Sequence, residues 1–186
     1  MVVIGLIAES GAGKDACSNY LKEKGFYIGH TGNKLRQLVI EENRTPSDKN
    51  CIELQHEMEK KFGALHLPSL IIKDMLNNEL SAYNSVRKVA DVLALNNAFG
   101  RDLIFLLVNA SQENRYKRMI GRKEERDKKS FEGFLEDEQL RIERGLSTRE
   151  VLDKIKELGL NLYTIDNNHS LEEFYAQIDR FIASLL

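Results

Sequence analysis

The amino-acid sequence predicts an α/β fold in which the strands of a parallel sheet alternate with helices. Residues 2–8 and 103–108 are continuously apolar runs, a pattern typical of parallel strands that are buried on both faces. Segments with helical spacing of apolar residues separate the expected strands, and parallel strands need such crossovers. The chain has 186 residues, the length of one ordinary domain. We therefore expect a single domain over residues 1–186.

The other elements follow in order along the chain. We expect strands at 25–29, 80–84 and 160–165, with the first of these ended by a glycine, and helices at 14–24, 35–42, 49–62, 69–75, 86–99 and 148–158. The closing helix has the clearest amphipathic pattern, and Ser170 with Glu173 predicts a capping box at its start. Helix breaks are expected near Pro46 and around Leu67 and Pro68. Two segments, about 33–78 and about 115–145, look like excursions from the sheet.

Composition excludes several classes of function. The formal net charge is -2, which argues against a dedicated nucleic-acid binder. Apolar runs stay well below the roughly 20 residues that span a bilayer. Cys17 and Cys51 lack metal-binding spacing and suggest a reduced compartment, and the four histidines show no ligand spacing. We expect a cytoplasmic protein with no membrane or nucleic-acid partner.

A glycine-bearing turn follows the first strand and precedes a helix. The stretch matches the P-loop (Walker A) pattern G-x-x-x-x-G-K-[ST] except at its two ends, and it reads Ala8, Glu9, Ser10, Gly11, Ala12, Gly13, Lys14, Asp15. Glycines let backbone N–H groups turn toward a phosphate chain, and the N-terminus of the next helix favours the same anion. Lys14 would neutralise β- and γ-phosphate oxygens. The sequence therefore predicts a nucleoside triphosphate site.

The last position of this pattern is unusual. Asp15 stands where Ser or Thr usually supplies a hydroxyl to Mg²⁺. A carboxylate is a hard oxygen ligand that serves this metal directly or through water. Its charge also opposes the phosphates, so we expect Asp15 both to hold Mg²⁺ and to tune nucleotide affinity.

With these residues in place, the chain resembles P-loop kinases of the nucleoside-monophosphate-kinase superfamily. It is most similar to dephospho-coenzyme A kinase-like proteins and to archaeal adenylate-kinase-like ATP-binding proteins, and the GKD ending resembles certain phage-type deoxynucleotide kinases. The resemblance runs nearly end to end. It rests on the segments 5–15, 31–36 and 85–87, on 109–110 with Arg115, Arg118 and Arg122, and on 131–135 and 166–174.

The resemblance implies a three-layer P-loop NTPase fold with a five-stranded parallel sheet. The excursion at about 33–78 would be a helical acceptor-binding region, and the one at about 115–145 an arginine-rich lid. Arg36 and Arg87 would hold the acceptor's phosphate, because a planar guanidinium binds two phosphate oxygens at once. Arg118 and Arg122 would close over the transferring phosphoryl group, whose spread charge is what such enzymes stabilise. ATP and Mg²⁺ are the implied cofactors.

Two positions depart from the family pattern. An acid usually follows the second strand, where Asn33 stands here, and Asp-Gly often ends the third strand, where Asn84 and Ser85 stand. An amide forms hydrogen bonds but cannot accept a proton as a carboxylate does. Three explanations remain open: a slip in the comparison, compensation by Glu9 and Asp15, or loss of activity.

Two functions follow from the sequence. The first is a small-molecule kinase that moves the γ-phosphoryl group of ATP to a nucleotide-like acceptor, either a nucleoside or deoxynucleoside monophosphate or dephospho-coenzyme A. The second is a catalytically weak nucleotide-binding module or ATPase switch that acts through a partner, as Asn33 and Asn84 suggest. Asn33, Arg36 and Arg87 are the predicted acceptor-binding residues, and Lys14, Arg87, Arg118 and Arg122 the predicted catalytic ones. An Asn-Lys-x-Asp guanine signature is missing from the sequence, which argues against a GTPase. The resemblance implies adenine rather than guanine.

Overall fold

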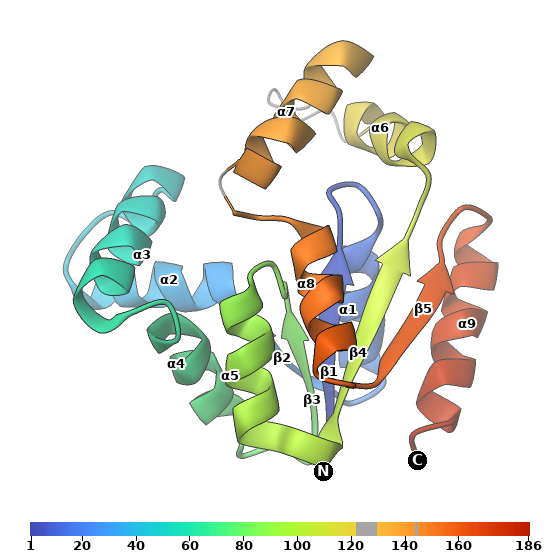
Figure 1. The fold of residues 1–186 in the computed structure, drawn as a ribbon, viewed down its shortest axis with the longest axis horizontal. Coiled ribbons are helices and arrows are strands. Elements are labelled where there is room, and N and C mark those ends of the chain that lie inside the picture. The colour runs from blue at the N-terminus through green and yellow to red at the C-terminus, as the bar shows by residue number, and fades with distance from the viewer. Residues whose placement is uncertain (122–129, 144) are drawn as a thin grey trace.

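The computed structural model describes residues 1–121, 130–143 and 145–186. In this part of the chain five parallel strands form one sheet in the order β2-β3-β1-β4-β5. The strands are β1 (Val2–Ala8), β2 (Tyr27–His30), β3 (Leu80–Asn84), β4 (Leu103–Asn109) and β5 (Leu162–Asp166). The predicted fold class is confirmed, including the weakly patterned third strand, and the helices lie on both sides of the sheet (Figure 1).

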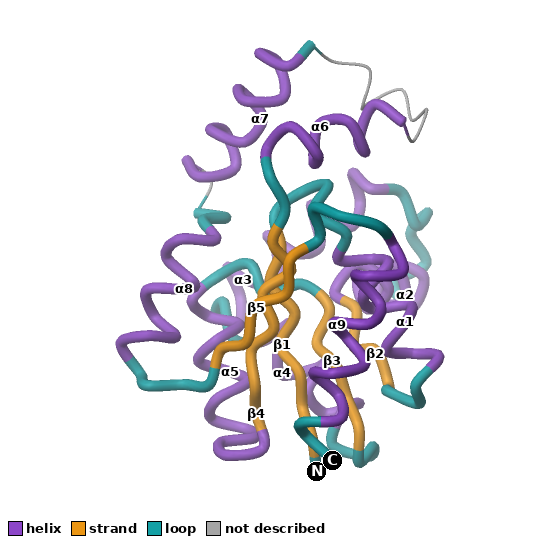
Figure 2. The backbone as a smooth tube through the Cα atoms, turned by 90° about the vertical axis from the view of Figure 1, so that its right-hand side faces the viewer, coloured by secondary structure: helices purple, strands orange, loops and turns teal. Residues whose placement is uncertain are grey.

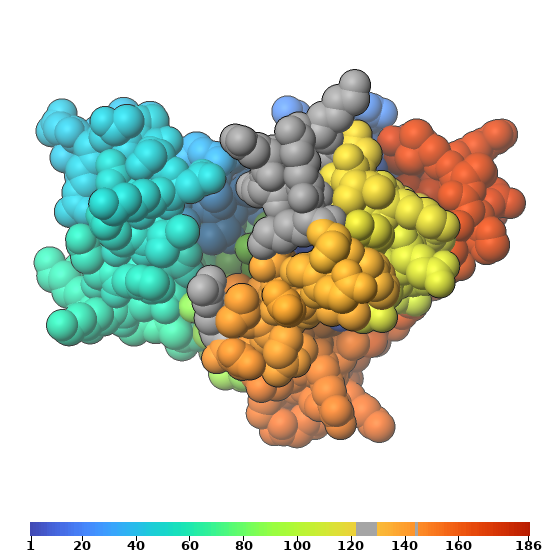
Figure 3. All heavy atoms as spheres, turned by 90° about the horizontal axis from the view of Figure 1, so that it is seen from above, coloured from blue at the N-terminus to red at the C-terminus, as the bar shows by residue number. Residues whose placement is uncertain are grey.

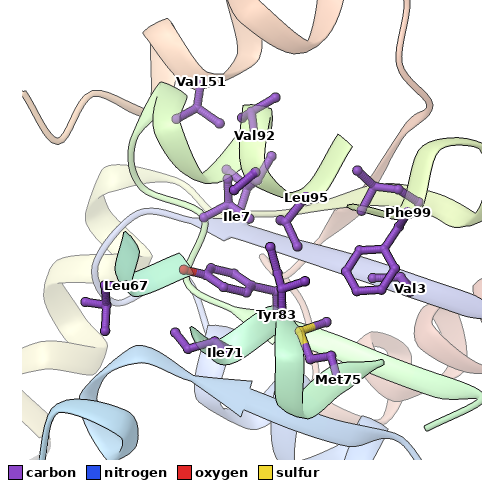
Figure 4. Close-up of a cluster of buried hydrophobic side chains, with 14 of the residues drawn as sticks. Val3, Ile7, Leu67, Ile71, Met75, Tyr83, Val92, Leu95, Phe99 and Val151 are labelled. Atoms are coloured by element: carbon purple, nitrogen blue, oxygen red, sulfur yellow. The ribbon is translucent and has the colours of Figure 1, made fainter. Parts of the chain in front are cut away.

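Helices cover each face of the sheet because β1 sends alternate side chains to opposite sides. Val3 and Ile7 join a core with helices α4 (His66–Met75), α5 (Val89–Phe99) and α8 (Thr148–Glu157), part of which is shown in Figure 4. Ile4 and Leu6 join a second core with α1 (Lys14–Glu23) and α9 (Leu171–Ala183). Figure 2 shows the resulting layers of helix, sheet and helix. Both cores fix the carboxyl end of β1, where the glycine loop begins.

The second strand ends one residue later than the sequence suggests. Gly29 does not end it: the strand continues to His30, which pairs in register with Asn84 of β3. A Cβ at Gly29 would lie 2.6 Å from the Ile71 side chain, so the glycine is needed for close packing of α4 on the sheet. His30 is thereby placed at the carboxyl edge of the sheet.

The three helices that follow β2 also begin earlier than expected. Helix α2 spans Thr31–Glu41 rather than starting at Leu35, because the His30 side chain caps it. Helix α3 spans Asp48–Phe62 and is capped by Ser47. The break expected around Pro68 lies at 63–65 instead, and Pro68 sits in the first turn of α4, where proline leaves no helical hydrogen bond unmade.

Two helices lie above the carboxyl edge of the sheet. They are α6 (Gln112–Gly121) and α7 (Phe131–Glu143). Viewed from above, α2 and α3 lie to one side and α6 and α7 to the other (Figure 3). Within the described residues, none of the helices is both long and apolar enough to span a bilayer.

Candidate functional site

The loop between β1 and α1 has the backbone geometry of a phosphate cradle. Gly11 and Gly13 have φ angles of 80° and 104°, a left-handed region that other residues adopt only with strain. Gly13 is the N-cap residue of α1 and no side chain caps it. The first N–H groups of α1 are therefore open to an anionic ligand at the positive end of the helix dipole.

Both glycines are also required by close neighbours. A Cβ at Gly11 would lie 2.6 Å from the backbone oxygen of Arg115 in α6. A Cβ at Gly13 would overlap the Asn167 amide nitrogen, and that nitrogen donates to the Ala12 carbonyl at 2.8 Å. The loop is thus held from two sides, by α6 and by the segment that follows β5.

Lys14 lies under this loop in a largely buried position. Its ammonium donates to the Asp15 carboxylate at 2.7 Å and to Asn84 Oδ1 at 2.6 Å, and its side chain is 15% exposed. Burial lowers its pKa, and the nearby Arg87 adds to that effect, whereas Asp15 opposes it. A buried ammonium that is only partly compensated is well placed to gain from binding a phosphate.

Asn84 occupies the carboxyl end of β3 and is almost fully buried. Its Oδ1 accepts from Lys14 and its Nδ2 donates to Ser18 Oγ at 3.3 Å. An amide supplies both an acceptor and a donor, whereas an ionised carboxylate only accepts. The residue that stands in place of an expected acid therefore positions the loop lysine.

His30 pairs in register with Asn84. It is not among the site residues that the sequence predicts. Its Nδ1 accepts from the N–H groups of Gly32 and Asn33, at 3.0 and 3.3 Å. In the neutral ring, Nε2 must then carry the proton. Burial lowers the pKa of His30, and so does Lys14. The ring is therefore a neutral donor with a fixed tautomer.

The predicted acceptor residues lie at the same edge but are open to solvent. Asn33, Arg36 and Arg87 are all exposed. Arg36 is 3.5 Å from the Asp48 carboxylate. The Arg87 side chain has no ion pair with any residue that the structure describes. Its backbone N–H is fixed at 2.9 Å by the buried Asp91 carboxylate, so the start of α5 sets where this guanidinium can reach.

Arg115 ties the loop to the two upper helices. Its guanidinium, 3% exposed, lies 2.8 Å from Glu9 Oε2 and donates to the Ser10 carbonyl at 3.3 Å. It also forms a two-pronged contact with Glu138 of α7 and lies over the Phe134 ring. Its Nε is buried without a partner among the described residues. This arginine therefore shapes the loop rather than facing an acceptor.

Arg118 contacts the segment that follows β5. Its Nη2 donates to the backbone oxygen of Asn167 at 2.5 Å, and its Nη1 is buried without a partner among the described residues. Burial lowers its pKa. Arg122, the other predicted lid arginine, falls outside the described residues. Arg141 of α7 comes close enough to Arg87 that its pKa is lowered, first by partial burial and then by that charge.

Asp15, the predicted metal ligand, is not part of an acidic cluster among the described residues. Asp15 is paired with Lys14 and its side chain is 63% exposed. Among the residues that the structure describes, no three acidic, histidine or cysteine side chains converge on a metal-sized site. Asp15 alone would therefore hold Mg²⁺ together with phosphate oxygens and water, the usual arrangement for this ion.

Comparison with known proteins gives a fold and a group of archaeal relatives. No family model matches the chain. A UPF0200 protein of Methanosarcina mazei is 23% identical over all of this chain and 96% of its own length. One from Thermoplasma volcanium is 25% identical over 89% of this chain and 87% of its own. The crystal structure of TT1252 from Thermus thermophilus matches with a TM-score of 0.60 at 18% identity over the full chain. None of these names states an activity.

Three residues of the site gave little signal in the sequence. His30 precedes the segment 31–36, but a lone histidine is usually structural. Asn167 belongs to a pair of asparagines after the last strand, and its contact with Gly13 depends on how β5 lies beside the loop. Arg141 is one charge among many in a charged stretch. Thr31 and Asn33 follow His30 directly and are residue types that usually cap helices, so the sequence does not point to His30 as the cap.

Proposed function

We propose that this protein is an ATP-dependent phosphotransferase that acts on a nucleotide-like small molecule. One observation carries the proposal. A buried lysine, held by Asn84, lies at the open N-terminus of α1 beneath a loop with two left-handed glycines. This combination suits a chain of phosphates, because the N–H groups and the ammonium all present positive charge to one small volume.

One group of residues would bind ATP, and a second group would bind the acceptor. Loop N–H groups and Lys14 would bind the β- and γ-phosphates, and Asp15 would hold Mg²⁺. Mg²⁺, when bound, neutralises charge on the phosphate oxygens. Arg36 and Arg87 would bind the acceptor at the edge formed by β2 and β3. Because phosphoryl transfer needs positioning and charge stabilisation more than covalent help, this set is sufficient.

The proposal is tested by direct assay of the purified protein. It is incubated with γ-labelled ATP, Mg²⁺ and a panel of nucleoside monophosphates, nucleosides and dephospho-coenzyme A, and labelled products are separated by chromatography. We expect transfer to at least one acceptor. If the protein binds ATP by calorimetry but labels nothing in the panel, the phosphotransferase proposal fails.

A second function is favoured by the amides at the acceptor edge. Asn33 and Asn84 stand where acids are expected, so a nucleotide-binding module that acts through a partner also fits. On this alternative, the double variant Asn33→Asp/Asn84→Asp gains phosphotransfer at nearly unchanged ATP affinity. On the first proposal, Asn84→Asp weakens ATP binding, because a buried carboxylate beside Lys14 competes with the phosphates. Calorimetry and the labelling assay on the same variants separate the two.

A further inference from the structure

Three charged side chains form a chain of contacts between the glycine loop and α7. Glu9 of the loop lies 2.8 Å from the guanidinium of Arg115, and the same guanidinium donates to both carboxylate oxygens of Glu138. Arg115 belongs to α6 and Glu138 to α7, so the contacts join the loop to both helices above it (Figure 1). We call Glu9, Arg115 and Glu138 the acid–arginine triad.

The triad lies directly against the backbone that would bind the phosphates. Arg115 donates to the Ser10 carbonyl at 3.3 Å, and its backbone oxygen is the atom that a Cβ at Gly11 would meet at 2.6 Å. The Glu9 carbonyl accepts from the Ala12 N–H at 3.1 Å, so Glu9 is part of the turn itself. Charges on the triad therefore act on the phosphate site at short range.

The triad carries more negative than positive charge. At neutral pH its two carboxylates and one guanidinium leave one negative charge uncompensated. Within the described residues, neither acid has a second cation at ion-pair distance. Glu9 is half exposed, whereas Glu138 is mostly buried and the guanidinium is 3% exposed. A triphosphate is a polyanion, and like charges repel more strongly where protein replaces water. The triad should therefore oppose the ligand that the rest of the loop attracts.

We propose that Glu9 and Glu138, through the guanidinium that they share, weaken the binding of a nucleoside triphosphate and so favour release of the nucleotide. This inference rests on the triphosphate site of the proposed function. When either acid loses its charge, Arg115 neutralises the other one fully. Because Glu138 belongs to α7, the contact also couples the position of α7 to the affinity of the loop, and such coupling is reciprocal.

The first test removes charge and keeps the contacts. In Glu9→Gln and in Glu138→Gln the amide oxygen can still accept from Arg115, so the loop stays anchored while one negative charge is lost. We expect each variant to bind ATP about 2- to 5-fold more tightly in calorimetry, the range that exposed charge pairs give. Glu136→Gln makes the same charge change at an exposed position of α7, and it should leave ATP affinity unchanged.

The second test asks whether the gain in affinity follows charge. Inorganic triphosphate has no base or sugar, so it should show the same gain as ATP in both variants. The gain should shrink between about 0.1 and 1 M salt, because the Debye length falls from about 10 to about 3 Å. A purely structural triad predicts the reverse: ATP binding would be unchanged or weaker in both variants, at every salt concentration.

Each outcome bears on a different claim. A variant that keeps the unfolding temperature but binds ATP no more tightly than the unchanged protein overturns the role of that acid, and so does a gain that salt does not reduce. If the gain is present but the labelling assay finds no transfer, the phosphotransferase fails and this inference stands. If the unchanged protein binds neither ATP nor inorganic triphosphate, the proposed function fails and this inference fails with it.

Discussion

The two sides of the candidate site differ in how much of their geometry the protein itself supplies. The glycine loop is held by Arg115 on one side, by Asn167 on the other and by the contact of Asn84 with Lys14 from below. The acceptor edge presents Asn33, Arg36 and Arg87 as exposed side chains. The protein therefore fixes more of the geometry of the proposed nucleotide side than of the proposed acceptor side.

This difference predicts two kinds of mutational effect. Changes on the loop side should reduce both stability and nucleotide binding, because the same contacts serve both. Changes at the acceptor edge should alter acceptor kinetics at constant stability, because exposed side chains there make few contacts to lose.

The largest expected effect is that of Lys14→Ala. Removing the buried ammonium should lower phosphotransfer about 10²- to 10³-fold, the range seen when one charge-stabilising group is lost, and should weaken ATP binding measured by calorimetry. Lys22→Ala, an exposed lysine on the same helix, is the matched control and should change neither. Unchanged ATP affinity in Lys14→Ala would mean that the loop is not the nucleotide site.

Arg115→Met should produce the largest loss of stability. The substitution leaves Glu9 and Glu138 without their shared partner, and breaking such a pair costs about 3 kcal/mol, at the low end of the range because Glu9 is half exposed. Chemical denaturation measures the loss. Arg149→Met, at a surface position, is the control. A change below about 1 kcal/mol, within the range of surface ion pairs, would show that the loop is not anchored by α6.

The contrast between the two sides also explains what the sequence could reveal. The fold followed from β1 and β4, whose apolar runs need burial on both faces, and the loop followed from glycines at fixed spacing before Lys14. The roles of Arg115, Asn167 and His30 could not be predicted, because each depends on contacts between segments distant in the chain or on cap geometry. In the sequence, Asn84 stands where the family pattern has an acid. Only its position between Lys14 and Ser18 shows why an amide suits this site.

Arg87→Ala should have an intermediate effect that is confined to the acceptor. Its guanidinium has no ion pair among the described residues, so stability should stay within about 0.5 kcal/mol. KM for the acceptor should rise about 10- to 100-fold, as expected for a lost charged hydrogen bond. Arg101→Ala, an exposed arginine near the opposite end of the sheet, is the control. An equal rise in the KM for ATP and in the KM for the acceptor would contradict the assignment of Arg87 to the acceptor side.

The smallest expected effect is a pH dependence of stability that arises from His30. Its pKa in the folded protein is lowered from its ordinary value of 6.5, first by burial and then by the charges of Lys14, Arg87 and Arg36, whereas Asp15 opposes the shift. Below about pH 6.5 the unfolded chain therefore binds a proton that the folded protein does not, so stability falls as pH decreases from about 7.5 through the unfolded pKa.

Protonation of Nδ1 would also remove the cap of α2, whose loss typically costs about 1 kcal/mol. Urea denaturation between about pH 5.5 and 7.5, across the unfolded pKa, should show a shallower slope of stability with pH in His30→Asn than in the unchanged protein. His56→Asn, an exposed histidine on α3, should leave the slope as it is. If His30→Asn and the unchanged protein lose stability equally toward acid, the ring is not held as a neutral cap. His30 would then belong with the exposed residues of the proposed acceptor side rather than with the residues whose positions the protein itself fixes.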